Sequence, residues 1–249
     1  AYRLNLPQLL ALANAQRGTP VVDTAHLLPW RLRDLFWLPS ADSAEGSATF
    51  IAVDNDWLPD TAWMIARMDP RDPDALALAV KGGHNGEPRG HLDVGSFVVH
   101  WRGEMLITDP PDPLAGWQAH SVPVVNGLGQ LHGTVARAEI TERGVTGALD
   151  LLALELREAY PAQAGLRSLR RVVALHREAP GWVEIIDGAM FEDAPGMLET
   201  ALITAAPVEI VAERALLHGQ RGTLAVHFDP QQIAARVESV PGTYDLQRV

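Results

Sequence analysis

The chain has 249 residues, a formal net charge of −11 and no cysteine. The negative charge argues against non-specific binding to nucleic acid, and the lack of cysteine excludes disulfides and thiolate metal ligands. An apolar content of 47% and a charged content of 20% are typical of a globular protein with a sizeable core.

The sequence contains no apolar run of about 18 residues, so it predicts no transmembrane helix. The first residues, Ala-Tyr-Arg-Leu-Asn-Leu-Pro, lack the charged-then-apolar layout of a signal peptide. Because the chain does not begin with methionine, we expect a fragment or a processed form. A bacterial cytoplasmic or periplasmic location is the expectation, with no membrane partner.

The N-terminal part of the sequence favours helix. A helix is predicted over residues 7–17, where a proline suits the first turn and a glycine and a proline follow the last. A second helix is predicted over residues 29–37, and the polar stretch 40–47 is typical of a linker. We therefore expect residues 1–46 to form a helical tail and linker, and residues 47–249 to form one β domain.

From residue 49 onward the sequence consists of short apolar segments separated by turn residues, roughly every 8–12 residues, which is typical of antiparallel sandwiches. The fold class is therefore predicted to be mainly β, an antiparallel multi-stranded β-sandwich with a short N-terminal helical segment. Residues 150–159 favour helix by composition but also alternate like a strand, and both readings stay open. The predicted strands are 49–53, 61–67, 75–80, 96–101, 105–109, 121–126, 133–140, 147–150, 169–176, 181–186, 198–203, 208–212, 215–217, 223–228 and 235–239.

Three polar residues, His91, Asp109 and His120, lie beside apolar strand-like sequence. A hairpin turn near 102–104 would place Asp109 opposite about position 97, close to a strand that starts at His91. A third neighbouring strand, which His120 would precede, brings all three side chains to one end of the sheet. Two imidazoles and a carboxylate form a three-ligand set for zinc. The alternative is two hydrogen-bonded histidines and a turn aspartate, because the spacings match no short zinc motif.

These residues also belong to segments that resemble, in order and spacing, the C-terminal β-sheet domain of the heparinase II/III family of polysaccharide lyases. The similarity runs from about residue 47 to the end of the chain. It is carried by Gly83–Glu87, His91–Phe97, Gly103-Glu104, Asp109, His120–Pro123, Gly127, Gln130, Ala159–Pro161, Arg177 and Trp182–Asp187.

The resemblance implies a zinc ion held by His91, Asp109 and His120. Because zinc sites commonly need groups that orient their ligands, Glu87 and Asp93 are candidates to orient a ligand histidine. It also implies an α/α toroid domain in the full-length protein, mostly absent from this chain, with the sheet domain facing it across a cleft. Two features differ from the family pattern: Arg89 replaces a histidine, and the loop at 110–119 is short and contains no tyrosine.

By the same resemblance, four residues around the glycine-rich turn are candidates for substrate contact: His84, Asn85, Glu87 and Arg89. The alternatives are a turn asparagine and a surface histidine, and for Asp93 a hydrogen bond to the turn backbone. Gln130 either contacts sugar or satisfies backbone groups.

The only basic cluster consists of Arg167, Arg170, Arg171 and Arg177. It could bind a uronate carboxylate, or form a solvated strand face paired with acidic residues. Alternation on a strand places Arg171 and Arg177 on one face and Arg170 on the other. Tyr160 is interpreted as a structural residue and not as a catalytic base.

The function expected from the resemblance is that of the C-terminal domain of a lyase, which cleaves a uronate-containing polysaccharide by β-elimination. Its partners would be an anionic polysaccharide or oligosaccharide and the toroid domain. The isolated chain is expected to be inactive, because the missing toroid carries the base side of the cleft, and the catalytic base and acid stay unassigned. The alternative is a non-catalytic carbohydrate-binding or domain-interaction module. The sequence contains neither the Gly-x-Ser-x-Gly motif of serine hydrolases nor a Gly-x-Gly-x-x-Gly dinucleotide motif.

Overall fold

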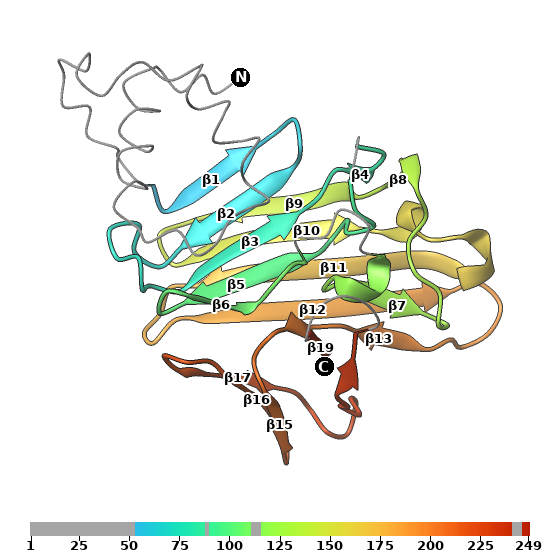
Figure 1. Cartoon of the computed structure of the whole chain (residues 1–249). Coiled ribbons are helices and arrows are strands. Elements are labelled where there is room, and N and C mark those ends of the chain that lie inside the picture. The colour runs from blue at the N-terminus through green and yellow to red at the C-terminus, as the bar shows by residue number, and fades with distance from the viewer. Residues whose placement is uncertain (1–52, 88–89, 111–115, 241–245) are drawn as a thin grey trace, which may run out of the picture. The chain divides into compact units, whose positions relative to one another are not determined.

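The computed structural model describes residues 53–87, 90–110, 116–240 and 246–249, all within one compact unit, Val53–Val249 (Figure 1). The helices predicted at 7–17 and 29–37, and the boundary predicted after residue 46, lie outside the described residues. No helix within the described part of the chain is long and apolar enough to cross a membrane.

The first layer is a five-stranded antiparallel sheet, called the first sheet, in which the strands follow the order β1-β2-β3-β5-β6. Buried and partly exposed side chains alternate along its central strands, as expected where one face packs on a core. Its strands are β1 (Asn55–Leu58), β2 (Trp63–Arg67), β3 (Ala77–Lys81), β5 (Phe97–Trp101) and β6 (Glu104–Ile107).

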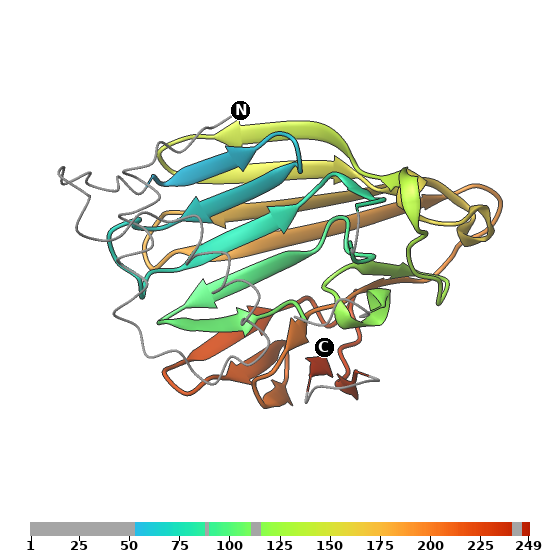
Figure 2. The same cartoon turned by 45° about the horizontal axis from the view of Figure 1, so that its top comes forward.

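The second layer is a four-stranded antiparallel sheet, called the second sheet, in the order β12-β11-β10-β9. Figures 1 and 2 show this sheet lying against the first, and one hydrophobic core contains buried residues of both, among them Phe97 and Leu152. Its strands are β9 (Glu139–Val145), β10 (Leu149–Glu155), β11 (Leu166–His176) and β12 (Trp182–Phe191). The mainly β, antiparallel sandwich predicted from the sequence is confirmed.

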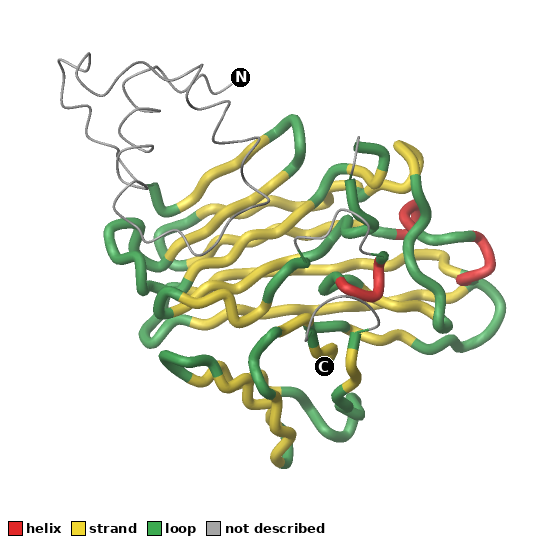
Figure 3. The backbone as a smooth tube through the Cα atoms, viewed as in Figure 1, coloured by secondary structure: helices red, strands yellow, loops and turns green. Residues whose placement is uncertain are grey.

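Smaller sheets and three short 3-10 helices complete the described structure, in which strands dominate (Figure 3). The small sheets pair β4 (His84–Asn85) with β8 (Gly133–Arg137), and β7 (Pro123–Val125) with β13 (Leu198–Thr200). One three-stranded sheet contains β14 (Ile203–Thr204), β19 (Gln247–Arg248) and β18 (Glu238–Ser239). Another contains β15 (Val208–Val211), β16 (Arg214–His218) and β17 (Thr223–His227). The 3-10 helices are η3 (Trp117–Ala119), η4 (Arg157–Ala159) and η5 (Ala162–Ala164).

The hairpin predicted at 102–104 is present. Arg102 and Gly103 form its two-residue turn, both with positive φ, of 52° and 74°. This combination is typical of the type I′ turns that match the twist of antiparallel strands. Val99 pairs with Ile107 in the register expected, whereas the pairs nearer the turn, His100 with Met105 and Trp101 with Glu104, are shifted by one residue.

Two expectations about the segments on either side of this hairpin were wrong. Residues 91–96 form a turn between β4 and β5 and not the start of a strand. The segment after His120 does not pair with β6, because β7 pairs with β13 instead. The ambiguous residues 150–159 continue as a strand to Glu155 and then form the single 3-10 turn η4.

Candidate metal centre

Four side chains with metal-binding atoms converge at one end of the first sheet. One ligand-capable atom from each of His91, Asp93, Asp109 and His120 lies within 4.8 Å of the others. They come from three segments: the turn between β4 and β5, the residues after β6, and the residue that follows η3. The structure therefore brings together the three residues that the sequence predicted as ligands, and adds Asp93.

Backbone hydrogen bonds fix the turn that carries His91 and Asp93. The Gly95 N–H donates to the Lys81 carbonyl at 2.7 Å, and the Ser96 N–H donates to the Asp93 carbonyl at 2.9 Å. Gly95 has a φ of +82°, and a Cβ there would lie 2.9 Å from a methyl group of Leu156. The turn therefore requires glycine at this position, because both the conformation and the space exclude a side chain.

The other two segments are anchored to the same late residue, Ile203. The Thr108 N–H, one residue before Asp109, donates to the Ile203 carbonyl at 2.8 Å. The Ile203 N–H donates to the Ser121 hydroxyl, next to His120, at 3.1 Å. This shared anchor holds Asp109 and His120 near each other, in place of the strand pairing that the sequence predicted.

His120 is fully buried, and its two ring nitrogens lie in different environments. Nδ1 lies 2.7 Å from Oδ1 of Asp109, whereas Nε2 has no hydrogen-bond partner among the described residues. The rings of His91 and His120 are 4.8 Å apart, centroid to centroid. A buried polar atom without a partner is unfavourable, so something that satisfies it is expected at this site. Two imidazoles and a carboxylate within reach of one another suit zinc, and the residues therefore fit the ion.

Asp93 forms a buried ion pair that the sequence analysis missed. The Lys81 Nζ lies 2.6 Å from Oδ1 of Asp93 and 4.0 Å from Oε2 of Glu87, and both Lys81 and Asp93 are about 95% buried (4% and 5% exposed). Lys81 therefore balances the charge of Asp93 within the cluster. A lysine that ends an apolar strand was the available signal in the sequence.

Asn85 and Gln130 form a buried amide pair beneath the turn. The Asn85 side-chain amide donates to Gln130 Oε1 and to the Leu131 carbonyl, both at 2.9 Å. Its oxygen accepts from the Asp93 and Val94 N–H groups at 3.2 and 3.3 Å. Gln130 also satisfies backbone groups, because its Nε2 donates to the Val94 carbonyl at 2.6 Å. Since Asn85 is 3% exposed, burial disfavours the predicted contact with substrate, and we assign it a supporting role.

Of the other predicted substrate residues, His84 and Glu87 are partly exposed, and Arg89 lies outside the described residues. His84 is partly exposed, accepts a hydrogen bond from the Gly86 N–H at 3.1 Å, and lines an open hollow of about 630 Å³ with Arg137 and Glu158. Glu87 is half-buried beside Lys81, and Arg89 lies outside the described residues. Substrate contact by these residues stays a prediction.

The arginine cluster separates as alternation predicted, with Arg171 and Arg177 turned inward and Arg170 exposed. Arg171 is fully buried, and Arg177 pairs with the buried carboxylate of Asp150. For Arg171 the predicted pairing with an acidic residue is present, but the guanidinium is buried in the core, which neither the substrate reading nor the solvated-face reading predicted. Its partner is Asp187, opposite it on β12.

Tyr160 is also buried, and its hydroxyl donates to the Pro123 carbonyl at 2.5 Å. Burial raises the pKa of this phenol far above its usual range. A phenol with a raised pKa and a buried hydroxyl is unsuited to act as a base, which agrees with the structural role predicted for it. Tyr2 and Tyr244 lie outside the described residues.

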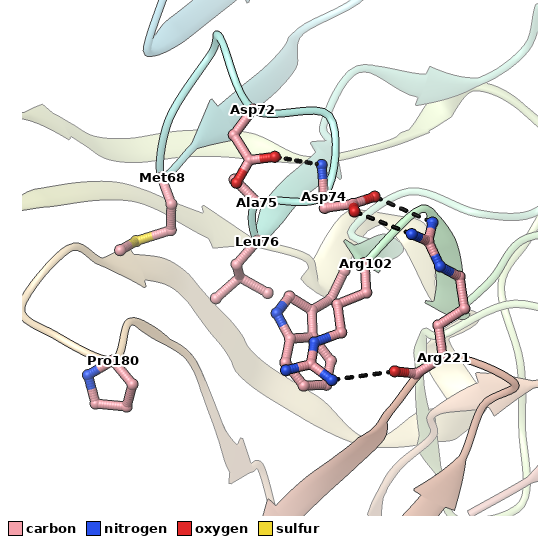
Figure 4. A pocket seen from close by; sticks show the side chains of 9 residues that line it. Met68, Asp72, Asp74, Ala75, Leu76, Arg102, Pro180 and Arg221 are labelled. Atoms are coloured by element: carbon pink, nitrogen blue, oxygen red, sulfur yellow. Dashed lines mark hydrogen bonds and ion pairs between the residues drawn. The ribbon is translucent and has the colours of Figure 1, made fainter.

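A second hollow, of about 530 Å³, lies at the turn of the β5–β6 hairpin (Figure 4). Arg221 forms a two-pronged ion pair with Asp74, at 3.1 and 3.0 Å, and Arg102 donates to the Arg221 carbonyl at 3.1 Å. The Arg102 guanidinium lies 4.4 Å from the centre of the Trp101 ring. These contacts join the β16–β17 turn to the sandwich. The described residues that line the hollow include no further cluster of metal ligands.

Comparisons with family models and with curated proteins gave no match. Among solved structures, 29 chains match. A heparinase III gene product matches with a TM-score of 0.66, and heparan sulfate lyase HepC from Pedobacter heparinus with a TM-score of 0.61. Each is 16% identical in sequence, and each match covers 98% of this chain and 39% of the other. The chain thus spans about two fifths of the length of these proteins. The resemblance seen in the sequence is confirmed at the level of fold: this chain shares its fold with part of heparinase III and of heparan sulfate lyase HepC.

Proposed function

We propose that this chain is the β-sandwich part of a polysaccharide lyase that cleaves a uronate-containing polysaccharide by β-elimination. In this proposal His91, Asp109 and His120 hold a zinc ion at the end of the first sheet. The observation that carries it is the convergence of these side chains within 4.8 Å around a fully buried histidine. The shared fold with heparinase III supports the reaction class.

Zinc and the Asp109–His120 hydrogen bond compete for the same nitrogen. Ligation through Nδ1 of His120 replaces the hydrogen bond and makes Asp109 a ligand. If the hydrogen bond persists, His120 instead offers its unpartnered Nε2, and Asp109 acts by fixing the ring. The first arrangement is the one we propose, because it supplies two imidazoles and a carboxylate, a ligand set typical of zinc, although it leaves Nε2 without a partner among the described residues.

Asp109→Asn distinguishes the two arrangements. The amide oxygen of asparagine still accepts a hydrogen bond from His120, but it is a neutral and poor zinc ligand. We expect Asp109→Asn to abolish stoichiometric zinc binding. Retention of one zinc per chain with only moderately weakened affinity would assign Asp109 the orienting role.

Elemental analysis of the purified, tag-free chain tests the site itself. We expect about one zinc per native chain, which is the stoichiometry of a single three-ligand site. His120→Ala should contain none, whereas the control His132→Ala, an exposed histidine outside the cluster, should match the native protein. A native chain without zinc contradicts the metal part of the proposal.

Zinc, when bound, supplies a fixed positive charge that organises the cleft end of the sheet. Elimination also requires a base for the C5 proton, an acid for the leaving oxygen, and a group that neutralises the uronate carboxylate. Tyr160, the tyrosine of the described residues, is buried and unsuited as the base. We therefore expect the isolated chain to produce no rise in ultraviolet absorbance on uronate polysaccharides. A rise would contradict the placement of the base on the part of the lyase that this chain lacks.

A domain-interaction module is the second candidate, and one observation favours it. Trp182, Ile186 and Met190 alternate along β12, so they share one face of the second sheet, and each is about half exposed (44%, 52% and 57%). If the chain lacks zinc, this candidate becomes the stronger one. Substitution of these three residues by threonine should then weaken association with a partner and leave zinc binding unaffected.

A further inference from the structure

Arg171 links the two loops that carry the proposed histidine ligands. Its Nη1 donates to the Gly95 carbonyl at 2.9 Å and to the Ser121 carbonyl at 2.6 Å. Gly95 belongs to the turn that carries His91, and Ser121 directly follows His120. One guanidinium nitrogen therefore joins the backbones of both loops, and the side chain that bears it is fully buried.

The other edge of the same guanidinium is held by Asp187. Nε and Nη2 of Arg171 donate to the two carboxylate oxygens at 2.7 and 2.6 Å. Asp187 lies directly opposite Arg171 in the β11–β12 pairing and also accepts from the Thr200 hydroxyl at 2.5 Å. The paired carboxylate balances the buried charge and fixes the plane of the guanidinium.

From these contacts we infer that Arg171 is a positioning residue for the metal centre. It fixes the distance between the loop that carries His91 and the loop that carries His120. The inference rests on the proposed function, in which residues of both loops bind the same zinc ion. Arginine is required because only its planar fork can reach a carboxylate and two carbonyls at once, whereas lysine carries a single nitrogen.

The test compares Arg171→Lys with Arg177→Lys in the full chain. Arg177 is the matched control, because it lies one residue beyond β11 and pairs with the buried Asp150, but contacts neither loop. Zinc affinity is measured by competition with a chromophoric chelator. Hydrogen–deuterium exchange of residues 91–96 and 119–122 is measured on metal-free protein, together with the unfolding midpoint.

We expect Arg171→Lys to weaken zinc binding by about 10–100-fold, the usual effect of losing a group that orients metal ligands. Both loops should exchange faster in this variant even without zinc. Arg177→Lys should lower the unfolding midpoint to a similar extent, with unchanged zinc affinity and unchanged exchange in the two loops. This separation is the signature of positioning, because a general loss of stability would affect both variants alike.

Unchanged exchange of both loops in Arg171→Lys overturns the inference, as does an equal loss of zinc affinity in the two variants. If the native chain binds no zinc, the proposed function fails, and loop exchange still decides whether Arg171 ties the loops. If Arg171→Lys does not fold, Asp187→Asn replaces it. This variant keeps Arg171 but loosens its orientation, so we expect a smaller loss of zinc affinity with faster exchange in the same loops.

Discussion

The buried Lys81–Asp93 pair provides a direct test of how burial changes the loss of folding stability when one partner of an ion pair is removed. We consider Lys81→Met, which keeps most of the side-chain volume and removes the charge. The pair has an N–O distance of 2.6 Å, with side-chain exposures of 5% and 7%. The Arg137–Glu158 pair has nearly the same distance, 2.7 Å, but exposures of 61% and 55%. The two pairs therefore differ mainly in their access to water.

The expected magnitudes follow from that difference. Removing one partner of a buried pair leaves an uncompensated charge away from water and costs about 3–5 kcal/mol of folding free energy. Removing one partner of an exposed pair costs about 0–1 kcal/mol, because water solvates the remaining charge. Glu87, 4.0 Å from the Lys81 nitrogen, cannot compensate in Lys81→Met because it has the same sign as Asp93.

Urea unfolding of metal-free protein, followed by tryptophan fluorescence, measures the free energy of unfolding for Lys81→Met and for the control Arg137→Met. We expect the first to lose several times more stability than the second, with similar urea dependence. Equal losses in the two variants would refute the reasoning, because they would show that Asp93 reaches water or another cation in the folded chain.

Three further outcomes are expected. Gly129→Ala should destabilise the chain by about 1–3 kcal/mol and lower its zinc content, because the added Cβ would overlap the ring of Trp117, three residues before the proposed ligand His120. Calorimetry measures the stability, and elemental analysis measures the zinc content. Tyr160→Phe should cost about 1–3 kcal/mol in urea unfolding, because the Pro123 carbonyl loses its buried donor. For Glu155, burial alone would raise the pKa, but hydrogen bonds from a serine hydroxyl and backbone N–H groups lower it below 4.5 overall. Its contribution to stability is therefore fully present above that value and is lost as the pH falls through the folded pKa, so Glu155→Gln should flatten the acid side of the stability curve.

Local patterns predicted the sandwich and one hairpin well. The β5–β6 hairpin follows from Gly103 between two apolar runs, and the placement of Arg171 and Arg170 on opposite faces follows from alternation along their strand. Both signals depend only on residues close in sequence. The helix-or-strand ambiguity at 150–159 could not be resolved in that way, because packing in the second sheet decides it.

The three residues predicted as ligands do converge in the structure, but partly through a different architecture from the one predicted. His120 approaches Asp109 because both neighbouring segments bond to Ile203, and not because a third strand pairs with β6. The roles of Lys81 and Arg171 depend on partners in other segments, which no local pattern reveals. A single sequence identifies polar residues in apolar surroundings, but only the tertiary structure shows which groups they contact.

The anchoring of both loops by late residues has a consequence for the order of folding. Arg171 bonds to a carbonyl 76 positions earlier, and Ile203 bonds to a hydroxyl 82 positions earlier. Contacts over such separations form slowly, because the intervening chain must lose its freedom before they contribute. During synthesis the hairpin that precedes Asp109 can therefore form early, while the two histidine loops stay without their anchors until β11 and Ile203 have been made. Metal added to a nascent chain that ends before residue 171 should find ligands but no assembled site.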